Sequence, residues 1–105
     1  MYQTANFTMV EAYWNIGKSI IEEQGGNEKA EYGTGLLKEL SKQMTKDFGK
    51  GFTVTNLKYM RQFYLTFPNS HALRDELSWT HYRLLMRVEN DNARKFYMEE
   101  AVKSQ

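Results

Sequence analysis

The spacing of apolar residues is the feature that most limits what this chain can fold into. Near its start, Phe7, Val10, Trp14, Gly17 and Ile21 follow alternating steps of three and four residues, which place side chains on one face of an α-helix. Similar spacing recurs downstream, and the 105 residues contain a single proline. The sequence therefore predicts an all-α fold, a compact bundle of about five helices in one domain covering residues 1–105.

Local start and stop signals divide the chain into these helices. Predicted starts have a hydroxyl or amide side chain that can accept from the free backbone N–H groups of a first turn, and predicted ends have glycine or proline. The expected helices run from Asn6 or Thr8 to Gln24 before Gly25-Gly26, from near Thr34 to Gly49, from the Thr53 cap to Pro68, from the Ser78 cap through Val88, and from Asn90 or Asp91 to the end, with a short helical turn near Ser70–Glu76.

The helical wheel separates inner from outer residues on each predicted helix. Gly17 lies within the apolar stripe, and we expect it to allow close approach of another helix. The third helix points Leu57, Met60, Tyr64 and Phe67 one way, and Thr55, Lys58, Tyr59, Gln62 and Thr66 the other. The other predicted inner faces are Leu37, Leu40, Met44 and Phe48 on the second helix, and Ala93, Phe96, Tyr97 and Ala101 on the fifth.

The segment 49–64 joins a glycine-rich turn to a polar helix. The turn Gly49-Lys50-Gly51-Phe52 has the length and glycine content of a helix-turn-helix corner, and Phe52 and Leu57 have the spacing of a hydrophobic staple. The stretches TVTNLK at residue 53 and SWTHYR at residue 78 share a pattern of hydroxyl cap, apolar, Thr, Asn or His, apolar and basic residues. Either a helix-turn-helix-like unit is duplicated, or two ordinary capped helix starts look alike.

Charge is unevenly distributed although the net charge is only +1. Residues 1–35 contain two Lys and five Glu, residues 36–70 contain five Lys, one Arg, one Glu and one Asp, and residues 71–105 contain six basic and six acidic groups. The three thirds therefore sum to −3, +4 and zero, and local basic patches attract polyanions whatever the total. The absence of cysteine excludes a disulfide scaffold, and no signal peptide or membrane-spanning run is visible. We expect a cytoplasmic protein.

No catalytic motif is visible in the sequence. An acid two residues before a Lys, as in a metal-dependent nuclease motif, occurs nowhere. His71 and His81 are the only histidines and lack the spacing of a zinc site. Ser78 and His81 have the spacing of a nucleophile and its base, but a capping Ser facing the third helical residue is more often structural. The chain is therefore predicted not to be an enzyme by itself, with no metal and no cofactor.

Several blocks of this sequence resemble the N-terminal domain of the YhcG family of bacterial proteins. The blocks are Tyr-Trp-x-Ile-Gly at 13–17, Gly-Phe-Thr-x-x-Asn-Leu at 51–57 and Leu-Ser-Trp-Thr-His at 77–81, in order across nearly the whole chain. The resemblance implies a helical domain with a helix-turn-helix that precedes a PD-(D/E)xK nuclease-like domain. That second domain is absent here, so we expect a domain fragment of a longer, nuclease-like protein.

The resemblance and the basic third helix together predict nucleic-acid recognition, with DNA as the expected partner and RNA left open. If the third helix enters a major groove, its polar side chains meet base edges or phosphates. His81 and Asn56 have an alternative role, since they can instead pack or hydrogen-bond within the domain. The candidate binding residues are Lys50, Thr53, Thr55, Asn56, Lys58, Tyr59, Arg61 and Gln62, with Thr80, His81, Arg83 and Arg87 in the second unit, and Lys42 and Lys46 as additional backbone contacts.

A protein-interaction or dimerisation module without DNA contact is the competing hypothesis. Aromatic residues such as Tyr2, Tyr59 and Tyr97, together with six Met, are residue types that favour interfaces. An apolar patch on the fourth or fifth helix would support it. A homodimer is compatible with both hypotheses, because helix-turn-helix proteins commonly bind as dimers.

Overall fold

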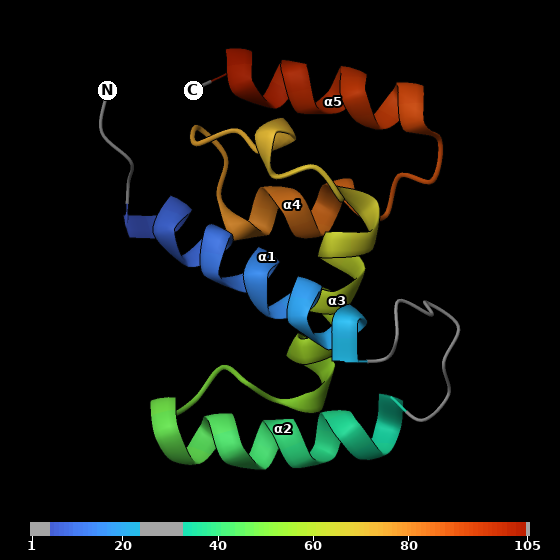
Figure 1. The fold of residues 1–105 in the computed structure, drawn as a ribbon. Coiled ribbons are helices and arrows are strands. Elements are labelled where there is room, and N and C mark those ends of the chain that lie inside the picture. The colour runs from blue at the N-terminus through green and yellow to red at the C-terminus, as the bar shows by residue number, and fades with distance from the viewer. Residues whose placement is uncertain (1–4, 24–32, 105) are drawn as a thin grey trace.

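The computed structural model describes residues 5–23 and 33–104, and these residues form a bundle of helices without a strand (Figure 1). This confirms the all-α prediction. The five α-helices of this part of the chain, with one short 3₁₀ helix, are α1 (Ala5–Glu23), α2 (Gly33–Phe48), α3 (Val54–Thr66), the 3₁₀ turn (Ser70–Ala72), α4 (Trp79–Leu85) and α5 (Asp91–Lys103). The predicted stop at Gly25-Gly26 lies outside the described residues.

The last three α-helices begin at side-chain caps. Thr53, Ser78 and Asn90 each accept a hydrogen bond from the backbone N–H three residues later. The predicted caps Thr53 and Ser78 are thus confirmed, and of the two starts considered for the fifth helix Asn90 is the N-cap and Asp91 the first helical residue. The predicted stop of α2 is also confirmed, because Gly49 has φ 88°, a conformation that other residues rarely adopt.

Two predicted bounds are wrong. The fourth helix ends at Leu85 rather than Val88, because the N–H groups of Arg87 and Val88 bond to carbonyls only three residues back. These bonds tighten the chain beyond α-helical geometry. The helical turn expected over residues 70–76 is confined to Ser70–Ala72, where Asn69 caps it by accepting from the His71 N–H.

The core lies between α1 and α3, which cross in the middle of the molecule (Figure 1). The predicted stripe on α1 is buried, and so are Leu57, Met60 and Phe67 on the α3 side. The Trp14 indole N–H donates to the Phe67 carbonyl over 2.7 Å, which satisfies a buried backbone group at the end of α3.

Gly17 is the point of closest approach between these two helices. A Cβ at this position would lie 2.0 Å from the Met60 carbonyl oxygen and 3.2 Å from the Tyr64 Cβ. The prediction that Gly17 permits close helix approach is therefore confirmed. The contact at Gly17 also sets the distance between α1 and α3.

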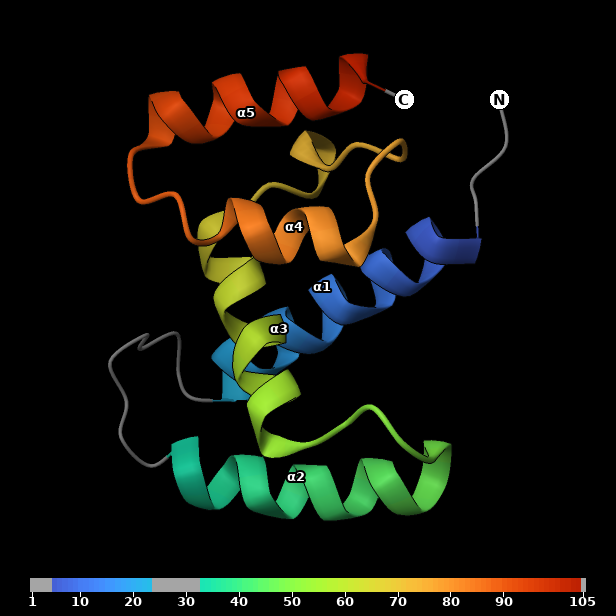
Figure 2. The same cartoon turned by 180° about the vertical axis from the view of Figure 1, so that it is seen from behind.

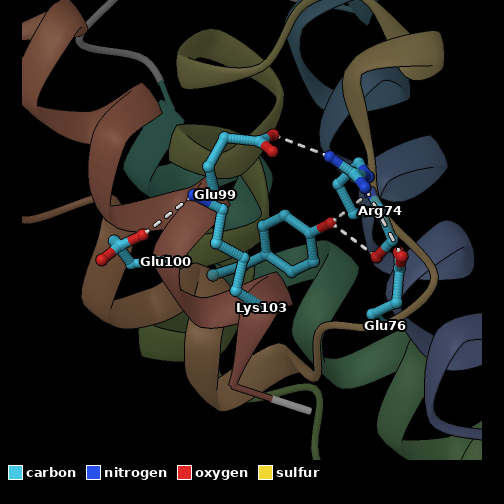
Figure 3. Close-up of polar contacts among 6 residues, drawn as sticks. Arg74, Glu76, Glu99, Glu100 and Lys103 are labelled. Carbon is cyan, nitrogen blue, oxygen red and sulfur yellow. Dashed lines mark hydrogen bonds and ion pairs between the residues drawn. The ribbon is translucent and has the colours of Figure 1, made fainter.

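A polar connection joins the segment before α4 to α4 and α5. The Tyr82 hydroxyl, on a fully buried side chain, accepts from the Arg74 N–H over 2.6 Å and donates to the Arg74 carbonyl over 2.9 Å. The guanidinium of Arg74 pairs with Glu99 at 2.7 Å and with Glu76 at 3.4 Å (Figure 3). Burial raises the pKa of Tyr82 to about 12. The Tyr82 hydroxyl thus fixes the segment around Arg74 against α4, and the exposed Arg74–Glu99 pair adds one contact from that segment to α5.

Three aromatic residues that we predicted to face inward are exposed. Phe96 is 59% and Tyr97 54% exposed, because α5 packs instead through Met98, with Ala101 and Val102 half-buried beside it. Phe48 is 70% exposed. The last turn of α2 extends past α3 (Figure 1), and the Phe48 ring lies against that of Phe52, at 6.0 Å between centroids.

No helix in the described part of the chain combines the length and apolar character that crossing a membrane requires.

Candidate nucleic-acid interface

The turn before α3 is held by two of the predicted site residues. Gly51 has φ 107°, and its carbonyl accepts a 3.1 Å hydrogen bond from the side-chain amide of Asn56. The Thr53 hydroxyl accepts from the Asn56 backbone N–H over 3.1 Å. The side chains of Thr53 and Asn56 thus fix the entry angle of α3, in line with the alternative role considered for Asn56.

The outward face of α3 is mainly polar. Leu57, Met60 and Phe63 are buried on one side of the helix. The other side presents Thr55, Lys58 and Gln62, all exposed, and Lys50 is exposed in the preceding turn. The Gln62 amide donates to the Thr66 hydroxyl over 3.2 Å, an exposed contact that a ligand can replace. Arg61 is half-buried at the edge of this face.

The start of α4 is a reciprocal capping box. The Ser78 side chain accepts from the His81 N–H, and His81 Nδ1 accepts from the Ser78 N–H over 3.0 Å. Ser78 and His81 are therefore structural partners at a helix start. This is the role that we preferred over a nucleophile and its base. The exposed residues of this helix and its extension include Thr80, Leu84 and Arg87.

Tyr59 and Arg83 join the outward sides of α3 and α4. The Arg83 guanidinium carbon lies 4.4 Å from the centroid of the Tyr59 ring, within the range of a cation–π contact. Both side chains are half-buried, so each limits the motion of the other. In the view of Figure 2, α3 and α4 lie on the same side of the molecule, in front of α1. Candidate residues 24 positions apart in sequence thus share one surface.

The two segments that form this surface carry basic and no acidic side chains, with Asp47, Asp75, Glu76 and Glu89 directly beyond their ends. Residues 48–74 contain Lys50, Lys58 and Arg61 as well as Arg74, and no Asp or Glu. Residues 77–88 contain Arg83 and Arg87, again without Asp or Glu. Two basic segments that pack side by side make a positive surface even in a nearly neutral domain. We call the surface made by Lys50, Lys58, Gln62, Tyr59 and Arg83 the basic face.

The lysines of α2 lie apart from the basic face. Lys38, Lys42 and Lys46 are exposed and follow one another at four-residue spacing, on the side of α2 opposite the buried Leu37. Because α2 meets α3 through the Leu37 side, these lysines point away from α3. Lys42 and Lys46, predicted as additional contacts to the nucleic-acid backbone, therefore form a row separate from the basic face.

The arrangement offers binding groups rather than reactive ones. Among the residues that the structure describes, no three His, Cys, Asp or Glu side chains are grouped so that they could hold a metal ion. The chemistry available on the basic face is hydrogen bonding, positive charge and one aromatic ring.

Two features of this region could not be found in the sequence. The Tyr59–Arg83 contact is a tertiary contact with no local signal. Leu84, more than half exposed, lines a groove of about 210 Å³ between α4 and α5 together with Val88 and Tyr97. Tyr97 is thus exposed, as the partner-surface hypothesis supposed, whereas Tyr2 lies outside the described residues.

Comparison with known proteins gives one family and one curated relative. The family described as "DUF1016 N-terminal domain" matches residues 1–105. The chain is also similar to a protein of Escherichia coli (strain K12) named "Putative nuclease YhcG", with 44% identity over 68 residues. That alignment covers 64% of this chain but only 18% of the relative. No solved structure matches the chain.

Proposed function

Because the chain belongs to the DUF1016 N-terminal domain family, we propose that it is the nucleic-acid recognition domain of a nuclease-like protein, with DNA as its ligand and the basic face as its contact surface. The observation that supports this most is the charge pattern of α3 and α4. Neither residues 48–74 nor residues 77–88 contain an acidic side chain, and Tyr59 and Arg83 bring the two segments together.

In this proposal the turn after α2 and helix α3 act as a helix-turn-helix-like unit. Lys58 and Gln62, exposed on successive turns of α3, reach base edges in the major groove, where Lys pairs with guanine and Gln with adenine. Lys50 in the turn and Arg83 on α4 contact phosphates, which position the helix without reading sequence. Thr53, Asn56 and His81 act indirectly by holding the starts of α3 and α4.

The Tyr59 ring gives Arg83 a defined position. A guanidinium held against a ring loses less conformational entropy when it binds a phosphate than a free side chain does. We therefore expect Tyr59→Leu to weaken binding even though the basic charges are all retained. Tyr59→Phe keeps the ring and serves as its control.

The proposal assigns no catalysis to this domain. Cleavage belongs to a PD-(D/E)xK nuclease-like domain elsewhere in the full-length protein, which we place in the cytoplasm with its DNA. The curated relative carries the name "Putative nuclease YhcG", and the aligned residues are a small part of it. The domain would then deliver the nuclease domain to its substrate.

Fluorescence anisotropy of a labelled random-sequence duplex, titrated with the domain over a range of salt, tests the proposal. We expect affinity to fall steeply with salt, and Lys50→Ala with Arg83→Ala to lower the slope of log K against log salt by about 2, since each lost phosphate contact contributes about 0.9. Lys95→Ala with Lys103→Ala removes the same charge from α5 and is the matched control. Salt-independent binding, or equal loss in both double variants, would contradict the basic face.

A further inference from the structure

Phe48, the last residue of α2, holds a large apolar ring in solvent. The side chain is 70% exposed, more than any other large apolar side chain in the described part of the chain. Its ring lies 6.0 Å from that of Phe52, which in turn meets Tyr13 of α1 edge-on at 6.5 Å. The Phe48 ring is thus held against the bundle through Phe52 while most of its surface stays accessible.

The turn that follows Phe48 leaves its backbone open to a ligand. Gly49 and Gly51 both have positive φ, and a Cβ added at either would meet nothing within 4 Å apart from its chain neighbours. Lys50, between them, is exposed. The turn runs from the end of α2 to the start of α3 (Figure 2). A strand of nucleic acid can therefore come close to the turn, next to a positive charge.

The surroundings of Phe48 favour a nucleotide over a protein partner. Residues 45–50 are all exposed, and Phe48 is the one apolar side chain among them, so they do not form the extended apolar patch that marks a protein-binding site. The Asp47 carboxylate accepts from the Gln43 amide over 3.1 Å, one turn back on α2. A nucleotide combines one flat base with one phosphate, and a single exposed ring with Lys50 beside it in the chain matches both groups.

We propose that Phe48 is a stacking site for an unpaired DNA base, which makes the ligand class of the domain a duplex with an adjoining single-stranded segment. The inference rests on the proposed function, because the duplex itself lies on the basic face. Lys50 belongs to that face and is two residues from Phe48 in the chain. A base inside a duplex is already stacked and paired, so the Phe48 ring takes a base beyond the end of the duplex, where no pairing has to be broken.

Competition against the labelled random-sequence duplex measures this selectivity. The competitors are an unlabelled blunt duplex, the same duplex with a short single-stranded overhang on either strand, and the same overhangs made of abasic nucleotides. We expect the overhang on one of the strands to raise affinity over the blunt duplex at least about fivefold, the low end of what one base–aromatic stack contributes. The abasic overhang should give little of that gain. Both overhangs carry the same phosphates, so the difference between them reports the bases alone.

Variants of Phe48 assign the gain to its ring. Phe48→Ala should bring the base-bearing and abasic overhangs to equal affinity, whereas Phe48→Trp, which keeps an aromatic face, should preserve their difference. Phe96→Ala removes a ring of similar exposure from α5 and is the matched control. Because Phe48 is mostly exposed, its replacement should leave the helical circular dichroism unchanged.

The outcomes separate this inference from the proposed function. Salt-sensitive binding of the blunt duplex with no gain from the overhang bases would overturn the stacking site and leave the basic face standing. A gain that survives Phe48→Ala, or that Phe96→Ala abolishes equally, would also overturn it. Failure of all three kinds of DNA to bind at low salt would refute both proposals.

Discussion

Replacing Gly17 with alanine tests the packing of α1 against α3, on which the position of the basic face depends. The added Cβ would lie 2.0 Å from the Met60 carbonyl oxygen and 2.8 Å from its carbonyl carbon. Both are backbone atoms of a helix whose Leu57, Met60 and Phe63 are buried, so they cannot turn aside as a flexible side chain would. The helices must instead move apart by more than about 1 Å to reach ordinary contact.

The expected cost follows from two opposing terms. Overpacking a tight contact costs about 1–3 kcal/mol and more where backbone must shift, and alanine recovers about 1 kcal/mol of helix propensity over glycine. We therefore expect Gly17→Ala to lower the free energy of unfolding by about 2 kcal/mol, equivalent to about 10 °C in Tm for a domain of this size.

Urea denaturation followed by far-UV circular dichroism measures this difference. Gly35→Ala is the matched control, because it makes the same change in α2 where a Cβ would meet nothing within 4 Å. The free energy of unfolding of Gly35→Ala should equal that of the wild type or exceed it by up to about 1 kcal/mol. If Gly17→Ala were as stable as Gly35→Ala, the close approach of α1 and α3 would be refuted.

Three further perturbations test the network and the turns. Tyr82→Phe leaves the backbone N–H of Arg74 without its partner and should cost about 1–3 kcal/mol, whereas the Arg74 carbonyl keeps its 3.2 Å bond from the Leu77 N–H. Because burial raises the pKa of Tyr82 to about 12, the unfolded chain loses this proton first, so wild-type stability should fall between pH 10 and 12 more steeply than that of Tyr82→Phe in urea titrations. Asn56→Ala should lower the unfolding free energy by about 1 kcal/mol through loss of the bond to the turn, whereas Thr55→Ala, exposed one residue earlier, should change it by less than about 0.5 kcal/mol. Glu99→Gln should cost only about 0.5 kcal/mol in the same assay, since its pair with Arg74 is solvent-exposed; a loss as large as that of Tyr82→Phe would contradict this.

The features predicted most accurately from the sequence are those that depend on residues close together in the chain. The caps at Thr53, Ser78 and Asn90 each depend on one side chain and a backbone N–H three residues away, so their residue types are sufficient to find them. The stripe on α1 is equally clear, because its apolar residues keep helical spacing over several turns.

The orientation of α5 could not be found in the same way. The predicted inner face holds Phe96 and Tyr97 with Ala101, whereas the structure turns Met98 inward with Ala101 and Val102 half-buried beside it. Ala101 lies between the two groups, so two inner faces fit the pattern. The choice is made by a tertiary contact, the burial of Met98 in the core cluster that contains Tyr82. Because Met98 takes the inner position, Phe96 and Tyr97 face outward and are both more than half exposed.

The candidate site also combines predictable and unpredictable features. The helical wheel of α3 predicts which of its residues are exposed, and Lys58 and Gln62 are exposed as predicted. The link between α3 and α4 depends on Tyr59 meeting Arg83 across 24 residues of chain, which residue types alone do not encode.

Mapping a DNA duplex onto the domain by ¹H–¹⁵N chemical-shift perturbation tests the central proposal most directly. The account predicts that amide shifts concentrate in residues 50–62 and around Arg83, with little change along the outer side of α2, and that they fade as salt is raised. Shifts that concentrate on Lys38, Lys42 and Lys46, or the absence of any shift at low salt, would contradict the assignment of α3 and α4 as the nucleic-acid interface.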